Sequence, residues 1–496
     1  MHRTSYDIEQ CRLLLLVLTA CLTVLAAPSP VRASGTAAQL KPDTGHRERF
    51  SKTIRELSAF RDRRTGTPDA DRSADLILSR FKALGLPQIS VQSFPVPSRR
   101  HKNAVLEVNG NRYPVDPFLS NAISPGTTPE TGITGRVVFA GKGEPRDFNF
   151  KPVEGSLVLM DLDSGDNWIN ALSLGAGALI YLYDGEADKF SFQEKTELTP
   201  VDFPRFIMSK EKAGQVFPGI LENTGKSRSM RATLKSDLKW IPARGRNIYA
   251  LIRGTDPSLK DELVIVEAFY DTAGFIAGRS PGADQACSAA TLLDLAEYLK
   301  KNPPVRPVLL AATAGRGNSL AGMREMIWTI QAKPRVIRKR AAGYQAVIKE
   351  SRRAIESVRQ FGKDTLSADA LEQVKKNILE SGRSRIEHLS NQLMKLRLAE
   401  APDTRLIKTI AARRMAFKRL EGKAGFNGLT PEENNLVDEL IPETLLRLEK
   451  RLANAEARSM ELTQAGSLNT LLKEYSIQTI VSLHLSSHGS GIGAFN

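Results

Sequence analysis

The stretch ELVIVEAFYDTAGF, residues 262–275, decides the fold of the central part of the chain. Its first half is a nearly continuous apolar run, which is typical of a buried strand covered on both faces. Similar runs occur at 247–254 (NIYALIRG) and 306–313 (RPVLLAAT), and residues 286–302 have the apolar period of an amphipathic helix. Strands that alternate with helices predict an α/β domain in which a mixed, mostly parallel sheet lies between helices.

The rest of the chain is predicted to surround this core in five further segments. Short strands alternate with Gly-rich turns in one of them, which predicts a β-rich insert, and long charged stretches with a helical period predict a helical hairpin or small bundle in another. An Asn-Gly pair at 109–110 predicts a tight hairpin. The predicted segments are a signal peptide at 1–33, the first part of the core domain at 40–124, the β-rich insert at 125–235, the α/β core at 236–330, the helical insert at 331–474, and the last core strand with the end of the chain at 475–496.

The first 33 residues have the pattern of an export signal. Basic residues precede an apolar run at 13–27, which is about 15 residues and short for a membrane span of about 20. Small residues then predict cleavage after Ala33, so we expect a periplasmic or extracellular protein. In the alternative interpretation LTAC is a lipobox, and Cys21 carries a lipid that anchors the protein to a membrane. The apolar run continues past Cys21, which favours ordinary cleavage.

Composition narrows the classes of partner. The 496 residues are 41% hydrophobic and 25% charged, as in ordinary globular proteins. Lys and Arg number 70 against 55 Asp and Glu, a net charge of +15. This excess is compatible with an anionic surface as partner, but its even spread favours a solvated basic face. Neither zinc-finger spacing nor a known nucleic-acid motif is present, so we expect no specific nucleic acid binding.

The order of several motifs resembles the zinc aminopeptidase family, which includes bacterial leucyl aminopeptidases and glutamate carboxypeptidases. The β-rich insert is similar to the protease-associated domain of those enzymes. The resemblance covers residues from about 45 to 325 and the last 20. The motifs that carry it are RTGTPDADRSADLILSRFKALGL (64–86), GAGALIYLYDG (175–185), NIYALIRGTDPSLKDELVIVEAFYD (247–271), SPGADQACSAATLLDLAEYLKK (280–301) and RPVLLAATAGRG (306–317).

The resemblance implies a site with two zinc ions about 3.5–4 Å apart that share a bridging water. It implies a His at the end of a strand, a bridging Asp, a Glu-Glu pair whose first member is the general base, an Asp on a later strand, and a late His. In this chain the first His falls on Phe269, the bridging Asp on Gln285, the Glu pair on Ala314 and Gly315, and the strand Asp on His484. The late His would fall beyond Asn496.

The residues that could still bind a metal near these positions are Asp271, Asp284, His484 and His488. Asp271 is more typical of a capping or turn residue. The two histidines would share a face only on a helix, whereas the pattern there is a strand running into a loop. Only eight residues follow His488, too few for the cysteine strand of a caspase-like peptidase.

Cys287 is the one cysteine that remains after cleavage at Ala33, so no intrachain disulfide is expected. A helix start could lower its thiol pKa, but a buried structural thiol is the commoner case.

Two functions remain. The first is a catalytically silent relative of the zinc aminopeptidases that binds a peptide or protein ligand and needs no cofactor. The second is an active metallopeptidase with zinc in a site rebuilt around Asp271, Asp284, His484 and His488. A hydrolase needs a base within reach of its water, and no acidic residue lies between Glu297 and Glu325. This favours the first function.

Overall fold

The structure is a computed structural model, and it describes residues 44–121, 126–185, 191–192, 194–196, 201–222, 230–279, 282–362, 366–398, 403–423, 426 and 428–485. The chain divides into two compact units, 1–48 and 49–496. The described part of the first unit is the first turn of helix α2 (Thr44–Ser58). The predicted signal peptide with Cys21, and His488, lie outside the described residues.

The described strands of the second unit form one mixed sheet. Its order is β11-β9-β10-β8-β4-β5-β6-β7-β3, with β1 beside β8 and β2 beside β1. Their bounds are β1 Gln88–Val108, β2 Asn111–Pro114, β3 Asp116–Pro117, β4 Ile133–Phe139, β5 Leu157–Asp161, β6 Ala178–Tyr183, β7 Arg205–Ser209, β8 Arg231–Ile252, β9 Glu262–Phe269, β10 Val308–Thr313 and β11 Ser476–Leu483. Strands β10, β9 and β11 pair in parallel, as do β4 to β7.

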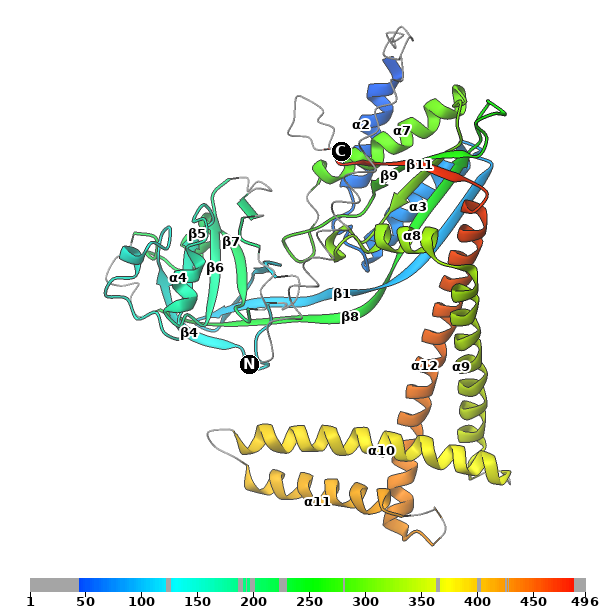
Figure 1. Cartoon of the computed structure of the whole chain (residues 1–496). Coiled ribbons are helices and arrows are strands. Elements are labelled where there is room, and N and C mark those ends of the chain that lie inside the picture. The colour runs from blue at the N-terminus through cyan, green and yellow to red at the C-terminus, as the bar shows by residue number, and fades with distance from the viewer. Residues whose placement is uncertain are drawn as a thin grey trace, which may run out of the picture. The chain divides into compact units, whose positions relative to one another are not determined.

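The α/β core places this sheet between two layers of helices (Figure 1). One face packs against α3 (Pro68–Ala83) and α7 (Cys287–Lys301) through Ile77, Leu292 and Leu310. The other face packs against α8 (Ala321–Gln331) and the end of α12 (Pro431–Leu472) through Leu309, Met326 and Leu472. The predicted α/β class is therefore confirmed.

The predicted hairpin is confirmed, because β1 pairs with β2 through a turn in which Asn109 and Gly110 have φ of 49° and 80°. The strand before it differs from expectation. The runs ISVQSFPV (89–96) and NAVLEVNGNRYPV (103–115) have the pattern of two separate strands, whereas β1 is a single strand that pairs with β8 from Gln88 to Glu107. This two-stranded ribbon continues from the α/β core into the β-rich lobe, so the two parts share one sheet.

The β-rich lobe has hydrophobic cores of its own on the two faces of β4 to β7. The short helix α6 (Lys210–Val216) packs into one of these cores, and the short helix α4 (Trp168–Ser173) and the 3-10 turn η1 (Pro145–Phe148) pack into the other. One core contains Leu159 and Phe206, and the other contains Met160 and Tyr181. Successive residues of one strand thus point to opposite faces.

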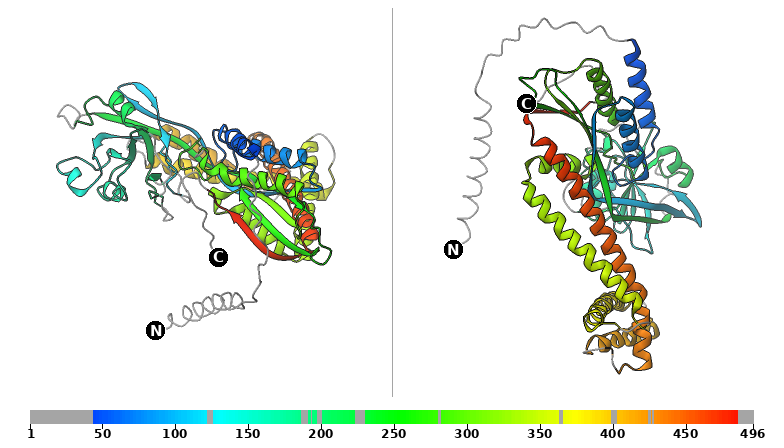
Figure 2. Two further views of the ribbon diagram at one scale, coloured as in Figure 1. Left: turned by 90° about the horizontal axis from the view of Figure 1, so that it is seen from above. Right: turned by 90° about the vertical axis from the view of Figure 1, so that its right-hand side faces the viewer.

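Four long helices form the segment predicted to be a helical insert: α9 (Pro334–Gln360), α10 (Ala368–Arg397), α11 (Thr404–Glu421) and α12. Helices α9 and α12 lie side by side and antiparallel (Figures 1 and 2), joined by ion pairs Arg352–Glu456 and Arg359–Glu449. Leu468 and Leu472 in the last turns of α12 pack on the α/β core. Within the described residues, no helix is both long enough and apolar enough to cross a membrane.

Candidate functional site

The carboxyl ends of β9, β10 and β11 bring the candidate residues together. Thr313 is paired with Phe269 in the parallel register, and Leu483 is paired with Ala268. His484 therefore follows β11 beside Phe269, and their ring centroids are 5.6 Å apart in an edge-to-face arrangement. Phe269 is 1% exposed. Two positions that carry metal ligands in the resembled family are neighbours here, but one of them is a buried phenyl ring.

Asp271 holds the turn that follows β10. Its fully buried carboxylate accepts hydrogen bonds from the Thr65 hydroxyl (2.6 Å), from the Gly315 backbone N–H (2.8 Å) and from the Arg316 backbone N–H (3.2 Å). Burial raises the pKa of Asp271 to about 6, and these hydrogen bonds oppose that rise. The carboxylate oxygens of Asp271 thus accept hydrogen bonds from other parts of the fold, as those of a capping residue do.

Gln285 lies in the 3-10 turn η3 (Asp284–Ala286) and is bonded to the loop after β9. Its side-chain oxygen accepts from the Ala273 N–H at 2.8 Å, and its side-chain nitrogen donates to the Ala273 carbonyl at 3.4 Å. An ionised carboxylate could replace only the first of these bonds, because it has no proton to donate. The amide at this position therefore matches the peptide group that it faces.

Ala314 and Gly315, the two positions of the family's Glu pair, are packed too closely to hold larger side chains. Ala314 is 1% exposed and donates its N–H to the Asn247 side chain at 3.3 Å. Gly315 has φ of +79°, where side chains are disfavoured. A Cβ there would lie 2.9 Å from the Ala321 Cβ and 3.1 Å from the Gly322 nitrogen. No side chain larger than hydrogen fits at Gly315 without moving this turn.

Two residues at the site were missed by the sequence analysis. Glu267, in the middle of β9, is fully buried and accepts hydrogen bonds from the hydroxyls of Thr313 and Ser482. Burial raises the pKa of Glu267, opposed by those bonds and by the charge of Arg316. The Arg316 guanidinium lies over the Phe269 ring at 5.7 Å. In the sequence, Glu267 could have been noticed as an acidic residue inside an otherwise apolar run.

The remaining candidates are not assembled into a ligand set. Burial, and then the charge of Arg316, lower the pKa of His484. Asp284 is buried in η3. Its charge, after burial, raises the pKa of Cys287, whose thiol donates to the Ala283 carbonyl at 3.4 Å. A raised pKa is the opposite of what a reactive thiol needs.

The donor chemistry of these positions does not fit a two-zinc site. Zinc takes imidazole, carboxylate or thiolate ligands. Phe269, Ala314 and Gly315 have no donor side chain, and the neutral amide of Gln285 is bonded to Ala273. In the part of the chain that the structure describes, no three His, Cys, Asp or Glu residues gather in a way that could hold a metal ion.

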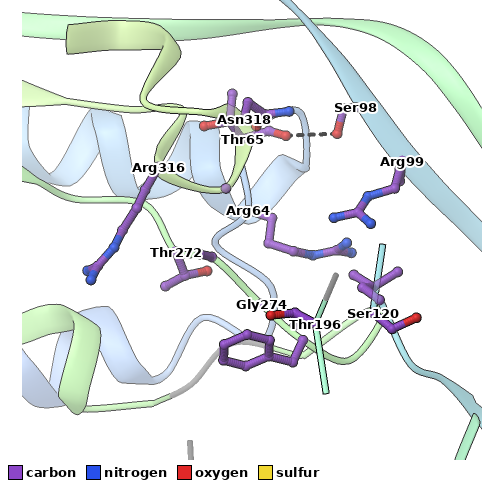
Figure 3. A pocket seen from close by; sticks show the side chains of 14 residues that line it. Arg64, Thr65, Ser98, Arg99, Ser120, Thr196, Thr272, Gly274, Arg316 and Asn318 are labelled. Carbon is purple, nitrogen blue, oxygen red and sulfur yellow. Dashed lines mark hydrogen bonds between the residues drawn. The ribbon is translucent and has the colours of Figure 1, made fainter. Parts of the chain in front are cut away.

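A pocket of about 400 Å³ opens next to these positions (Figure 3). The loop after β9 (272–275) and the turn after β10 (316–318) form part of its wall. Arg64, Arg99 and Ser120 also line it. No Asp or Glu is among the described residues of the lining, so its fixed charge is positive.

The core is an α/β domain in which the positions matched to the expected metal ligands carry other residues. The sequence model of peptidase family M28 matches residues 247–358, which contain β9, β10 and the turn at Gly315. This match agrees with the predicted resemblance to a peptidase family for this region of the chain. No curated protein matches the chain.

Solved structures that resemble the chain include several aminopeptidases. The zinc aminopeptidase BSAP from Bacillus subtilis has a TM-score of 0.43 and 24% identity, and the match covers 58% of this chain and 65% of that protein, slightly under two thirds. An aminopeptidase from Aneurinibacillus sp. strain AM-1 has a TM-score of 0.37 and 20% identity over 59% of this chain and 67% of that one. A peptidase M28 precursor from Shewanella amazonensis SB2B has a TM-score of 0.37 and 14% identity, covering 54% and 66%.

Proposed function

We propose that this protein is an exported relative of the zinc aminopeptidases that acts by binding a ligand and not by hydrolysing peptide bonds. One observation carries the proposal: the positions of the expected ligands hold Phe269, Gln285, Ala314 and Gly315, and each of them is engaged in the packing or hydrogen bonding of the fold. Export is supported by the signal pattern of residues 1–33, with a lipid anchor at Cys21 as the alternative.

Among the residues that the structure describes, no Asp or Glu lines the cleft to act as a general base. Such a base must lie within hydrogen-bond reach of the attacking water. Glu267 on β9 and Asp271, two residues after the end of β9, are both fully buried. Hydroxyl groups bond the two oxygens of Glu267, while Asp271 is bonded to Thr65 and to the turn at Gly315. Freeing either group for catalysis would leave buried donors without a partner, which costs roughly 1–3 kcal/mol for each donor.

The alternative, an active metallopeptidase with a rebuilt site, would use Asp271, Asp284, His484 and His488. It would require Asp271 to exchange its bonds to Thr65, Gly315 and Arg316 for a metal. The turn after β10 would then lose the acceptor that fixes it. The geometry of Asp271 therefore supports a structural role over the rebuilt site.

The test is turnover by the purified mature protein. We expect no release of product from aminoacyl p-nitroanilides or from short peptides, with or without added zinc, above the rate in buffer. A zinc aminopeptidase assayed in parallel controls for substrate quality. Turnover that rises with protein concentration and disappears after treatment with a chelator would overturn the proposal.

A further inference from the structure

We propose that the pocket beside the substituted site binds a small anionic ligand by a carboxylate or phosphate group held between Arg64 and Arg99. The inference rests on the proposed function, because it names the chemistry of the ligand that the cleft would bind. The shared feature of such ligands is an oxyanion, which a guanidinium recognises by paired N–H donors.

Arg99, on β1, lines the pocket, and its guanidinium has one hydrogen-bond acceptor among the described residues. Its guanidinium donates to the Asn121 carbonyl at 2.8 Å and lies over the Trp240 ring at 5.7 Å. It forms no ion pair with a carboxylate of the described residues. Burial, and then the charge of Arg64, lower the pKa of Arg99 to about 10. A guanidinium has five N–H donors, and the described residues provide an acceptor for one of the two Nη groups of Arg99, the Asn121 carbonyl.

Arg64 is positioned before any ligand arrives. Asp62 accepts from it at 2.8 and 2.6 Å in a bidentate pair. Its aliphatic stem passes close to Gly274, where an added Cβ would lie 3.0 Å from the Arg64 Cδ. Figure 3 shows the Arg64 and Arg99 side chains pointing toward one another, while Arg316 points away from this pair. Two like charges that face each other across a pocket repel, and an anion between them removes that repulsion.

Ser120 adds a neutral donor at the same place. It is 7% exposed, lines the pocket, and its hydroxyl has no hydrogen-bond partner among the described residues. The pocket volume of about 400 Å³ lies within the range of small-molecule sites, about 300–1,000 Å³. Asp62 offsets one of the three arginine charges that line it. The cleft thus has a net positive charge where the resembled family collects carboxylates around cations.

The experiment uses the mature protein passed over a chelating resin, so that no bound metal can recruit the anion. Sodium phosphate and sodium succinate are titrated separately by calorimetry, with ionic strength held constant by sodium chloride. Trp240 lies against Arg99, so tryptophan fluorescence gives a second signal. We expect saturable binding of at least one anion. Tighter binding of phosphate indicates a phosphorylated ligand, and tighter binding of succinate a carboxylic acid.

Arg99→Gln should weaken this binding by about 10- to 100-fold, since it removes charge-assisted hydrogen bonds. Arg100→Gln is the matched control: it removes the same charge from the next residue, which is exposed and does not line the pocket, and should leave binding unchanged. If Arg99→Gln does not fold, Ser120→Ala should still weaken binding by several-fold. Binding of neither anion, or equal binding by wild type and the folded pocket variants, would overturn the proposal. Zinc content or turnover would contradict the proposed function without changing the outcome of these titrations.

Discussion

Replacing Phe269 with His restores the family's first ligand position and should nevertheless destabilise the protein. The ring is 1% exposed, and its centroid lies 5.6 Å from the His484 ring and 5.7 Å from the Arg316 guanidinium. Burial of a phenyl side chain contributes roughly 1.5–3 kcal/mol. An imidazole keeps part of that area but buries two nitrogens, each of which costs about 1–3 kcal/mol if unpaired. We expect Phe269→His to lower the free energy of unfolding by about 2–4 kcal/mol.

The pH dependence separates this effect from simple loss of packing. Burial and the neighbouring Arg316 charge would lower the pKa of the new imidazole in the folded chain. The folded state would therefore bind this proton less tightly than the unfolded state does. The loss of stability should then grow as pH falls below about 6.5, the unfolded value for His. Phe269→Leu is the control, because it changes packing without a titratable group and should show no such growth. Urea unfolding at several pH values measures both variants.

Zinc calorimetry on Phe269→His tests the assignment of the family positions. We expect no binding, since Gln285, Ala314 and Gly315 still supply no ligand. A dissociation constant in the micromolar range or tighter, roughly 8 kcal/mol of binding free energy, would require most of a site to be present already. That result would refute the alignment of the missing ligands. Restoring activity should need His at 269, Asp at 285 and a Glu pair at 314 and 315 together, with the turn at Gly315 rebuilt to admit a side chain.

Three further predictions follow from buried groups and from the helical segment. Gln285→Glu should cost about 1–3 kcal/mol at pH 8 and less at pH 4, where the protonated acid can again donate to the Ala273 carbonyl; equal losses in urea unfolding at both pH values would contradict this. Burial raises the pKa of Asp271 from 3.8 to about 6, so the folded chain holds this proton more tightly and stability should fall as pH rises from about 4 to 6. Asp271→Asn should abolish that slope of up to ~1.4 kcal/mol per pH unit, and an unchanged slope would rule out Asp271 as its source. Excising residues 349–452 with a short Gly/Ser linker should leave cooperative unfolding of the α/β core intact, whereas excising 331–474 should abolish it because Leu468 and Leu472 pack on the sheet; equal behaviour of the two deletions would show that these leucines are dispensable.

Local patterns predicted most of the elements. The apolar runs at 247–254, 262–271 and 306–313 lie in strands β8, β9 and β10, and the Asn109–Gly110 pair forms the expected turn. The resemblance to a family also predicted that positions 269 and 484 lie near each other. These inferences succeed because burial on both faces of a strand, and positive φ in a hairpin turn, constrain residue type directly.

Long-range pairing explains what was missed. The runs ISVQSFPV and NAVLEVNGNRYPV have the pattern of separate strands, yet β1 continues through both, with Pro97 opposite Pro242 in β8, where both residues lack the N–H that a ladder would use. Helix α12 has one continuous period, so no local signal shows that its last turns join the sheet of the core. The pocket is lined by Arg64, Arg99, Ser120 and the loop after β9, which are far apart in the sequence. No single segment of the sequence therefore predicts it.

The central claim is that the residues at the family's ligand positions cannot hold zinc. The most direct measurement is elemental analysis of the mature protein, purified without chelators after expression in zinc-supplemented medium. We expect a zinc content far below one ion per chain, and a thermal unfolding midpoint that is the same after passage over a chelating resin. One or two zinc ions per chain that survive dialysis would contradict it, because a tightly held ion needs charged or imidazole ligands that Phe269, Gln285, Ala314 and Gly315 cannot supply.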